Sequence, residues 1–324
     1  MVRGGKAGLV RVWNVFGPLL GLLFVVAVFS ANPDVRPYFL TGANFKIILT
    51  QTVIVALCAL GMTMIIVSGG IDLSVGSAVA LTSVVGATAV LKGASPALAV
   101  VLTVATGGLL GLLNGAAIAG LNMLPFIVTL GMMGVARGSA KWLGGNQTVN
   151  YPDSPVNHLM ALEAPDKLLP LPIGVWLAVA LAVLMAVVMG QTVFGRHLFA
   201  IGANETAARL SGIRVRRCKL AVYALAGLFF GVGGLMQLSR LTQGDPTVAI
   251  GLELDVIAAV VIGGASLSGG SGSVAGSMIG ALIMAVLRNG SNQSGWPTYM
   301  QEIIIGIVIT LAVAVDRLRQ RRTA

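Results

Sequence analysis

The sequence predicts an all-α, polytopic membrane protein with about ten transmembrane helices, glycine-rich breaks between them and both termini cytoplasmic. Three observations carry this prediction. The 324 residues are 56% hydrophobic and only 10% charged, whereas soluble domains carry about 25% charged residues. The 43 glycines suit helices in lipid, where small residues let two backbones approach closely. The basic residues gather in a few short segments between long apolar stretches.

Stretches without charge mark the predicted spans, because a helix needs about 20 apolar residues to cross the hydrocarbon core. Five stretches hold one crossing each: residues 12–33, 47–71, 73–91, 168–195 and 220–239. Residues 93–136 hold two crossings, which break near Asn122 and Pro125. Residues 256–287 are interrupted by a Gly/Ser run (263–273), and together with residues 246–252 they give two more predicted spans. Residues 299–315 give the tenth span. The first span is too long for the apolar core of a signal peptide and is expected to remain.

Lysine and arginine orient the chain. An even number of spans puts both ends on one side, and thirteen of the 21 basic residues then fall on that side, at the N-terminus, in residues 194–219 and at the C-terminus. This side is therefore cytoplasmic. The prediction is one transmembrane domain over residues 1–324, with six spans in 12–193, a basic cytoplasmic loop in 194–219 and four spans in 220–316. The proline-rich loop 144–172 lies on the opposite side. It is interpreted either as a stiff interfacial linker or as a docking surface for an extracytoplasmic partner.

The basic loop contains a short helix with clear end signals. Asn204 can cap its first amides, and Glu205 suits the positive end of its dipole. Glu205 and Arg209 are spaced i,i+4 in the favourable order, and Gly212 can end the helix in a left-handed turn. Taken alone, the loop is either a solvated connector or a surface offered to another protein.

Several classes of function find no support in the sequence. There is no P-loop of the form GxxxxGK[ST]. The two histidines, His158 and His197, are far apart, and the two cysteines, Cys58 and Cys218, do not favour a structural disulfide. The formal charge of +10 lies mostly in short loops and tails and does not indicate nucleic-acid binding. The chain is therefore not expected to catalyse a covalent reaction, to hold a metal or to bind a cofactor.

Two glycine breaks resemble each other. Residues 67–74 read VSGGIDLS and residues 261–268 read VIGGASLS, so five of the eight positions match. Internal duplication is common in transporters, although glycine-rich spans also look alike by chance. Both breaks fall on the cytoplasmic side of the predicted topology.

Four blocks resemble the permeases of ribose-type monosaccharide ABC transporters. They are IIVSGGIDLSVGSAVAL (65–81), LNGAAIAGLNMLPFIVTLGMMGVARG (113–138), GRHLFAIGANETAARLSGI (195–213) and LELDVIAAVVIGGASLSGGSGSVAGSMIGALI (252–283). They occur in the order typical of that family. The outer segment GGNQTVNYPDS (144–154) departs from the more glycine-rich pattern of many relatives, which leaves docking and substrate identity open.

The resemblance implies a permease subunit of a bacterial inner-membrane importer for a ribose-, xylose- or galactose-like sugar. It implies a second permease chain, identical or not, a periplasmic sugar-binding protein, and a cytoplasmic ABC ATPase that would bind Mg-ATP. The loop 194–219 would then meet the ATPase. The residues expected to couple the two proteins are Gly202, Ala203, Asn204, Glu205, Ala208, Arg209 and Gly212, with Ala208 on a small-residue face that enters the ATPase.

A sugar pathway needs polar groups, because stripping water from hydroxyls without replacement costs several kcal/mol. The predicted pathway residues in or near the spans are Gln51, Asp72, Asn114, Asn122, Phe126, Thr129 and Asn289. Each also has a structural alternative: an Asn in a span often bonds a neighbouring helix, and Asp72 suits the start of the next helix. Asp255 and Glu253 are expected to be ordinary first-turn acids.

Other functions remain open at this stage. Within the same architecture, the solute could be another polar molecule such as a nucleoside or an amino acid. An ion-coupled secondary carrier would work without an ATPase, but it would need buried titratable residues, of which the spans hold few. A channel or membrane scaffold without energy coupling is the third class.

Overall fold

The computed structural model describes residues 4–162 and 170–321. This part of the chain is nearly all helical. Its elements are α1 (Gly4–Ala31), α2 (Arg36–Phe39), α3 (Gly42–Val67), α4 (Val75–Leu91), α5 (Pro96–Gly120), α6 (Pro125–Leu143), β1 (Val149–Asn150), the 3-10 helix η1 (Pro155–Leu159), α7 (Ile173–Gln191), α8 (Val193–Ala203), α9 (Glu205–Leu210), α10 (Val215–Leu241), β2 (Gln243–Gly244), α11 (Leu252–Ile262), α12 (Val274–Gln293) and α13 (Thr298–Arg321).

Within the described residues, five helices are long and apolar enough to cross a membrane: α3, α5, α7, α10 and α12. Shorter apolar helices include α4 and parts of α1 and α13. A polytopic, helical membrane protein is therefore confirmed, while the count of ten spans and the side of the termini stay predictions.

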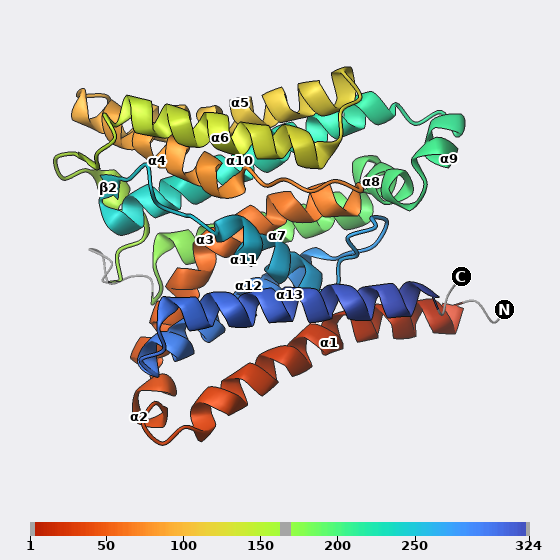
Figure 1. Cartoon of the computed structure of the whole chain (residues 1–324), viewed down its shortest axis with the longest axis horizontal. Helices are drawn as coiled ribbons and strands as arrows, with labels where there is room; N and C mark the ends of the chain where they lie inside the picture. Colours follow the sequence, from red (N-terminus) through yellow and green to blue (C-terminus); the bar gives the residue numbers. More distant parts are fainter. Residues whose placement is uncertain (1–3, 163–169, 322–324) are drawn as a thin grey trace.

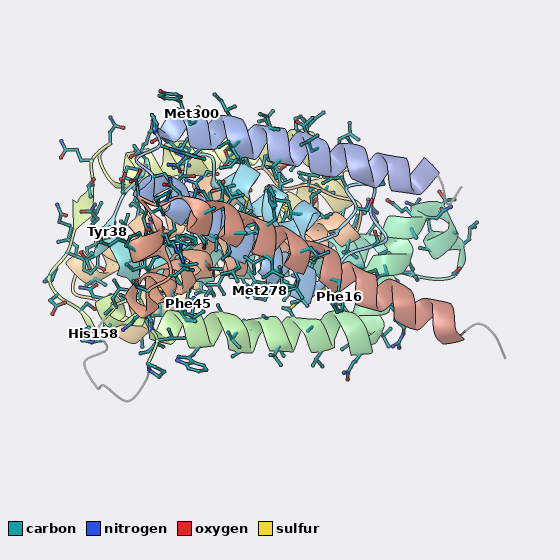
Figure 2. All side chains as sticks on the ribbon, turned by 90° about the horizontal axis from the view of Figure 1, so that it is seen from below. Phe16, Tyr38, Phe45, His158, Met278 and Met300 are labelled. Carbon is teal, nitrogen blue, oxygen red and sulfur yellow. The ribbon has the colours of Figure 1, made fainter. Side chains whose placement is uncertain are left out.

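The long helices run along the long axis of the molecule (Figure 1). The start of α1 and the end of α13 lie toward the same end of this axis as α8 and α9, which we call the α9 end. Helix α2 and strand β2 lie at the opposite end, the β2 end, where Figure 2 also places Tyr38, His158 and Met300. This arrangement agrees with the prediction that the termini and the basic loop lie on the same side of the membrane.

Helix α3 forms the centre of the bundle, and almost all of its apolar stretch is buried. Around it, glycines let helices approach closely. A Cβ on Gly111 would lie 2.9 Å from Gly227 Cα, and one on Gly107 would lie 2.6 Å from Gly231 Cα, so α5 and α10 meet backbone to backbone. Small residues at helix contacts are the expected packing device in lipid.

Helix α11 is shorter than a full membrane crossing. It has 11 residues, which is about half the length of a crossing. The preceding residues 245–251 are not helical, and Ala249 and Gly251 there have φ of 60° and 81°. The guanidinium of Arg137, on α6, holds this unwound segment: its Nη1 donates to the carbonyl oxygens of Pro246 (2.8 Å) and Val248 (2.7 Å).

Candidate coupling surface and solute pathway

The short helix predicted in the basic loop is present as α9, and its end signals work as expected. The Asn204 side chain accepts a hydrogen bond from the amide of Ala207 at 2.9 Å. Gly212 has φ of 85°, and the amide of Ile213 closes the turn on the Ala208 carbonyl at 3.1 Å. The sequence did not distinguish the second helix, α8, which occupies the first half of the predicted loop.

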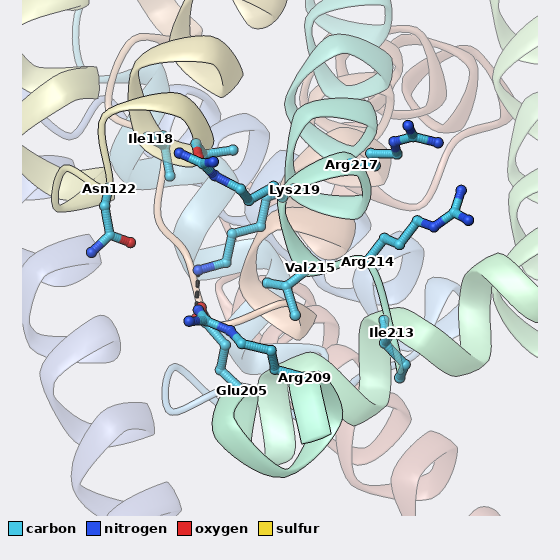
Figure 3. Close-up of a pocket in the computed structure, with 11 residues that line it drawn as sticks. Ile118, Asn122, Glu205, Arg209, Ile213, Arg214, Val215, Arg217 and Lys219 are labelled. Carbon is cyan, nitrogen blue, oxygen red and sulfur yellow. Dashed lines mark hydrogen bonds and ion pairs between the residues drawn. The ribbon is translucent and has the colours of Figure 1, made fainter. Parts of the chain in front are cut away.

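Glu205 ties α9 to the first turns of α10. Its carboxylate accepts from Lys219 Nζ at 2.6 Å and from Arg209 Nη2 at 3.1 Å (Figure 3). The hydrogen bond from Lys219, followed by the charge of Lys219 and the bond from Arg209, lowers the pKa of the Glu205 carboxyl. Because the ionised form is favoured, this link is present at neutral pH and is lost only when acid protonates the carboxylate.

The position of Ala208 contradicts the prediction. Ala208 is 4% exposed and packs with Ile201 and Val215 in a small core beneath α9, so it cannot enter a partner protein. A helix of six residues is too short for its sequence to define which face is buried. Leu210, which the sequence analysis did not single out, is a large apolar side chain of this helix and is 85% exposed.

A cavity of about 560 Å³ lies between α9, the end of α5 and the start of α10. Figure 3 shows its lining, in which five cations surround the single carboxylate of Glu205. One of the five, Arg216, donates to the Ala119 and Gly120 carbonyls at 2.8 and 2.6 Å and so caps α5. Asn122, predicted to line the solute pathway, lines this cavity at the α9 end.

The two similar glycine breaks meet each other and the end of α8. The amide of Gly270, in the Gly/Ser run 263–273 that continues the second break, donates to the carbonyl of Val67, the first residue of the first break, at 2.9 Å. A Cβ on Gly202 would collide with that carbonyl oxygen and with the Gly270 nitrogen. A Cβ on Gly269 would lie 3.0 Å from both Gly202 Cα and Gly69 Cα. We call these five residues the glycine junction; Ala203 touches it through Gly270.

Three of the predicted pathway residues come together in one buried network. Asp72 Oδ1 accepts from the amide and hydroxyl of Ser74 at 2.7 and 2.6 Å. The Asn114 amide donates to Asp72 Oδ2 at 3.2 Å and to Ser74 Oγ at 3.1 Å. Thr129 Oγ1 accepts from the amide of Leu73 at 3.1 Å. These contacts fix the first break to α5 and α6, which favours the structural role for Asp72, Asn114 and Thr129.

Two other predicted pathway residues lie elsewhere. Asn289 donates to Asn44 Oδ1 at 2.9 Å, and Gln293 donates to the same oxygen at 2.7 Å, so this cluster joins α12 to α3. Phe126 is an exposed side chain at the start of α6.

Toward the β2 end, a pocket of about 290 Å³ opens between α3, α10, α11 and α12; we call it the outer pocket. It contains Gln51, the only one of the seven predicted pathway residues to line it. Its other polar lining residues are Gln237, Arg240, Asp255, Arg288 and Asn292. Asp255 is not an ordinary first-turn acid, because it is buried and ion-paired with Arg288. In the described residues, no group of three or more His, Cys, Asp and Glu side chains could hold a metal ion.

Comparison with known proteins identifies the family of this chain. Residues 44–313 match the family described as "Branched-chain amino acid transport system / permease component". The ribose import permease protein RbsC of Bacillus subtilis is 41% identical over 94% of both chains, and that of Escherichia coli K12 is 39% identical over 93% of both. The galactose/methyl galactoside import permease protein MglC of Haemophilus influenzae is 35% identical over 92% of both chains. No solved structure matches. The resemblance predicted from the four blocks is thus confirmed, and the chain belongs to this family of transport-system permease components.

Proposed function

We propose that this chain is the membrane subunit of an ATP-driven importer of a ribose-like monosaccharide. The names of its relatives support a sugar: ribose, L-arabinose, galactose or methyl galactoside, and D-allose. The solute would be delivered by a periplasmic binding protein to two permease chains in the bacterial inner membrane. A separate cytoplasmic ATPase would bind Mg-ATP, and this chain would bind no cofactor. The basic residues at the α9 end support its assignment to the cytoplasm.

The observation that carries this proposal is the contact between the α8–α9 hairpin and the glycine junction. Arg209 and Leu210 present an exposed surface on α9, while at the end of α8 Gly202 touches both breaks and Ala203 touches the second. The breaks end α3 and connect α11 to α12, three helices that also line the outer pocket. A push on α9 by the ATPase would therefore reach the pocket through rigid elements, as alternating access requires.

Within this proposal the coupling residues divide into three roles. Asn204, Glu205 and Gly212 give α9 its ends and its attachment to α10. Ala208 anchors the helix to the chain's own core, which replaces its predicted place on the docking face. Arg209 and Leu210 would contact the ATPase.

Affinity purification of the tagged chain from its own cells tests the proposal. We expect mass spectrometry to find an ATPase with a P-loop, at a stoichiometric level, and a secreted sugar-binding protein when sugar is present. The matched control is an unrelated polytopic membrane protein carrying the same tag. Recovery of the chain without any ATPase, from cells in which it supports sugar uptake, would favour the ion-coupled carrier.

A further inference from the structure

We infer that the outer pocket is a solute-binding subsite within the permease itself, built for the hydroxyl groups of a neutral monosaccharide. The inference rests on the proposed function and goes beyond it, because coupling to an ATPase does not require the permease to bind its solute. It is carried by the polar groups of the pocket, their unused hydrogen-bonding capacity and their charges.

The ion pair of Asp255 and Arg288 lies at the centre of the argument. Asp255 is only 3% exposed, and its Oδ2 accepts from Arg288 Nη2. Asp255 Oδ1 and Arg288 Nε are buried, and neither has a hydrogen-bond partner in the described structure. An acceptor and a donor left unpaired away from water cost free energy. A hydroxyl that enters the pocket beside this pair could satisfy both, after a side-chain rotation, because a hydroxyl donates and accepts.

The remaining polar lining has spare capacity as well. The side chains of Gln51, Gln237 and Arg240 make no hydrogen bond within the described part of the chain. Asn292 uses its Oδ1 to accept from Gln301 at 2.8 Å, which leaves its amide hydrogens for another partner. Three amide groups and two guanidinium groups therefore converge with one carboxylate on the same space. Such a mixture of donors and acceptors matches several hydroxyls on one small ring.

The charges distinguish the solute classes. A charged solute would have to compete with the Asp255–Arg288 ion pair for its partners. A neutral polyol can bond to the groups around the pair without breaking it, since each hydroxyl can act as donor or acceptor. The volume of about 290 Å³ is near the lower end for small-molecule sites, which begin at about 300 Å³, and favours a monosaccharide over a nucleoside.

Arg137 is the positioning residue for one wall of this subsite. Ala249 and Ile250, at the end of the unwound segment, line the pocket together with Leu252, the first residue of α11. The two hydrogen bonds from Arg137 to Pro246 and Val248 hold the segment in place. The carboxylates of Glu253 and Asp245 supply the negative charges that act on this guanidinium. The positive φ of Ala249 (60°) is uncommon for a residue with a Cβ, which is consistent with a segment held by its surroundings.

The test is protection of a cysteine at the pocket mouth by sugar. Ile250 is 74% exposed and lines the pocket, so Ile250→Cys is introduced into the full chain with Cys58→Ala and Cys218→Ser. The purified chain in lipid nanodiscs is labelled with a water-soluble thiol reagent. We expect D-ribose to slow labelling in a saturable way, and leucine and uridine to leave the rate unchanged.

Variants then assign the protection to named groups. Asp255→Asn, and separately Gln237→Leu, should raise the ribose concentration for half-protection by about tenfold, the effect of losing one good hydrogen bond. Gln237→Leu is expected to fold, because this side chain makes no hydrogen bond within the described part of the protein. Arg137→Gln should cause a similar loss, which Arg137→Lys should partly restore. The matched carboxyl control is Glu302→Gln, on the exposed face of α13.

Three results would overturn the inference: no protection by ribose, protection by leucine or uridine, or equal protection in the parent and both pocket variants. None of these depends on an ATPase. If ribose protects the cysteine but the assembled transporter does not use ATP, the proposed function fails and the subsite stands. If uptake is ATP-driven without protection, the subsite fails alone.

Discussion

Gly202→Ala is expected to reduce sugar uptake by at least an order of magnitude, because a Cβ at this position collides with the Val67 carbonyl and the Gly270 amide. Both obstacles are backbone atoms that hydrogen-bond to each other, so no side chain can rotate away. Overpacking of this kind costs about 1–3 kcal/mol, and here it would separate α8 from both breaks. Uptake of radiolabelled sugar at equal membrane abundance measures the effect.

The matched control is Gly190→Ala, near the end of α7, where a Cβ meets nothing within 4 Å. Alanine is also the better helix former there, so uptake and thermal stability should match the parent chain. Uptake in Gly202→Ala equal to that in Gly190→Ala would remove the glycine junction from the coupling route.

Leu210→Glu is expected to abolish association with the ATPase while leaving the permease folded. Leu210 is almost fully exposed on α9, so the substitution removes little packing within the chain. Burying a leucine at an interface is worth about 1.5–3 kcal/mol, and a buried unpaired carboxylate would cost more. Recovery of the ATPase on the tagged chain measures the loss. Leu210→Met keeps an apolar side chain of similar volume and should retain the partner.

Ala208→Glu separates this prediction from general damage to the loop. Since Ala208 is buried beneath α9, this change should lower the melting temperature and the amount of permease in the membrane. If Leu210→Glu also lowers both, or if it retains the ATPase, then α9 is not a docking surface.

Local features of the coupling loop were predictable from the sequence, because their partners lie within a few residues. Asn204 caps the amide three positions later, Glu205 meets Arg209 one turn on, and Gly212 adopts the left-handed turn. The attachment of Glu205 to Lys219 and the burial of Ala208 depend on how α9 folds back onto α10. A six-residue helix has too little periodicity to predict that.

Contacts between distant segments could not be predicted for the pathway residues. Asp72 and Asn114 were singled out as polar residues in apolar spans, yet their carboxylate and amide bind each other across 42 positions. Asp255 and Arg288 are 33 positions apart, and no spacing rule pairs them. The similarity of the two glycine breaks was visible in the sequence, but their contact through Val67 and Gly270 emerged only from the tertiary structure.

Sugar uptake into proteoliposomes tests the central claim most directly. The vesicles contain this chain with the ATPase that co-purifies with it, and the binding protein is added outside. The account predicts accumulation of D-ribose that requires the binding protein outside and Mg-ATP inside, and that persists when ion gradients are collapsed by ionophores. Accumulation by this chain alone, driven by an ion gradient and indifferent to ATP, would contradict it.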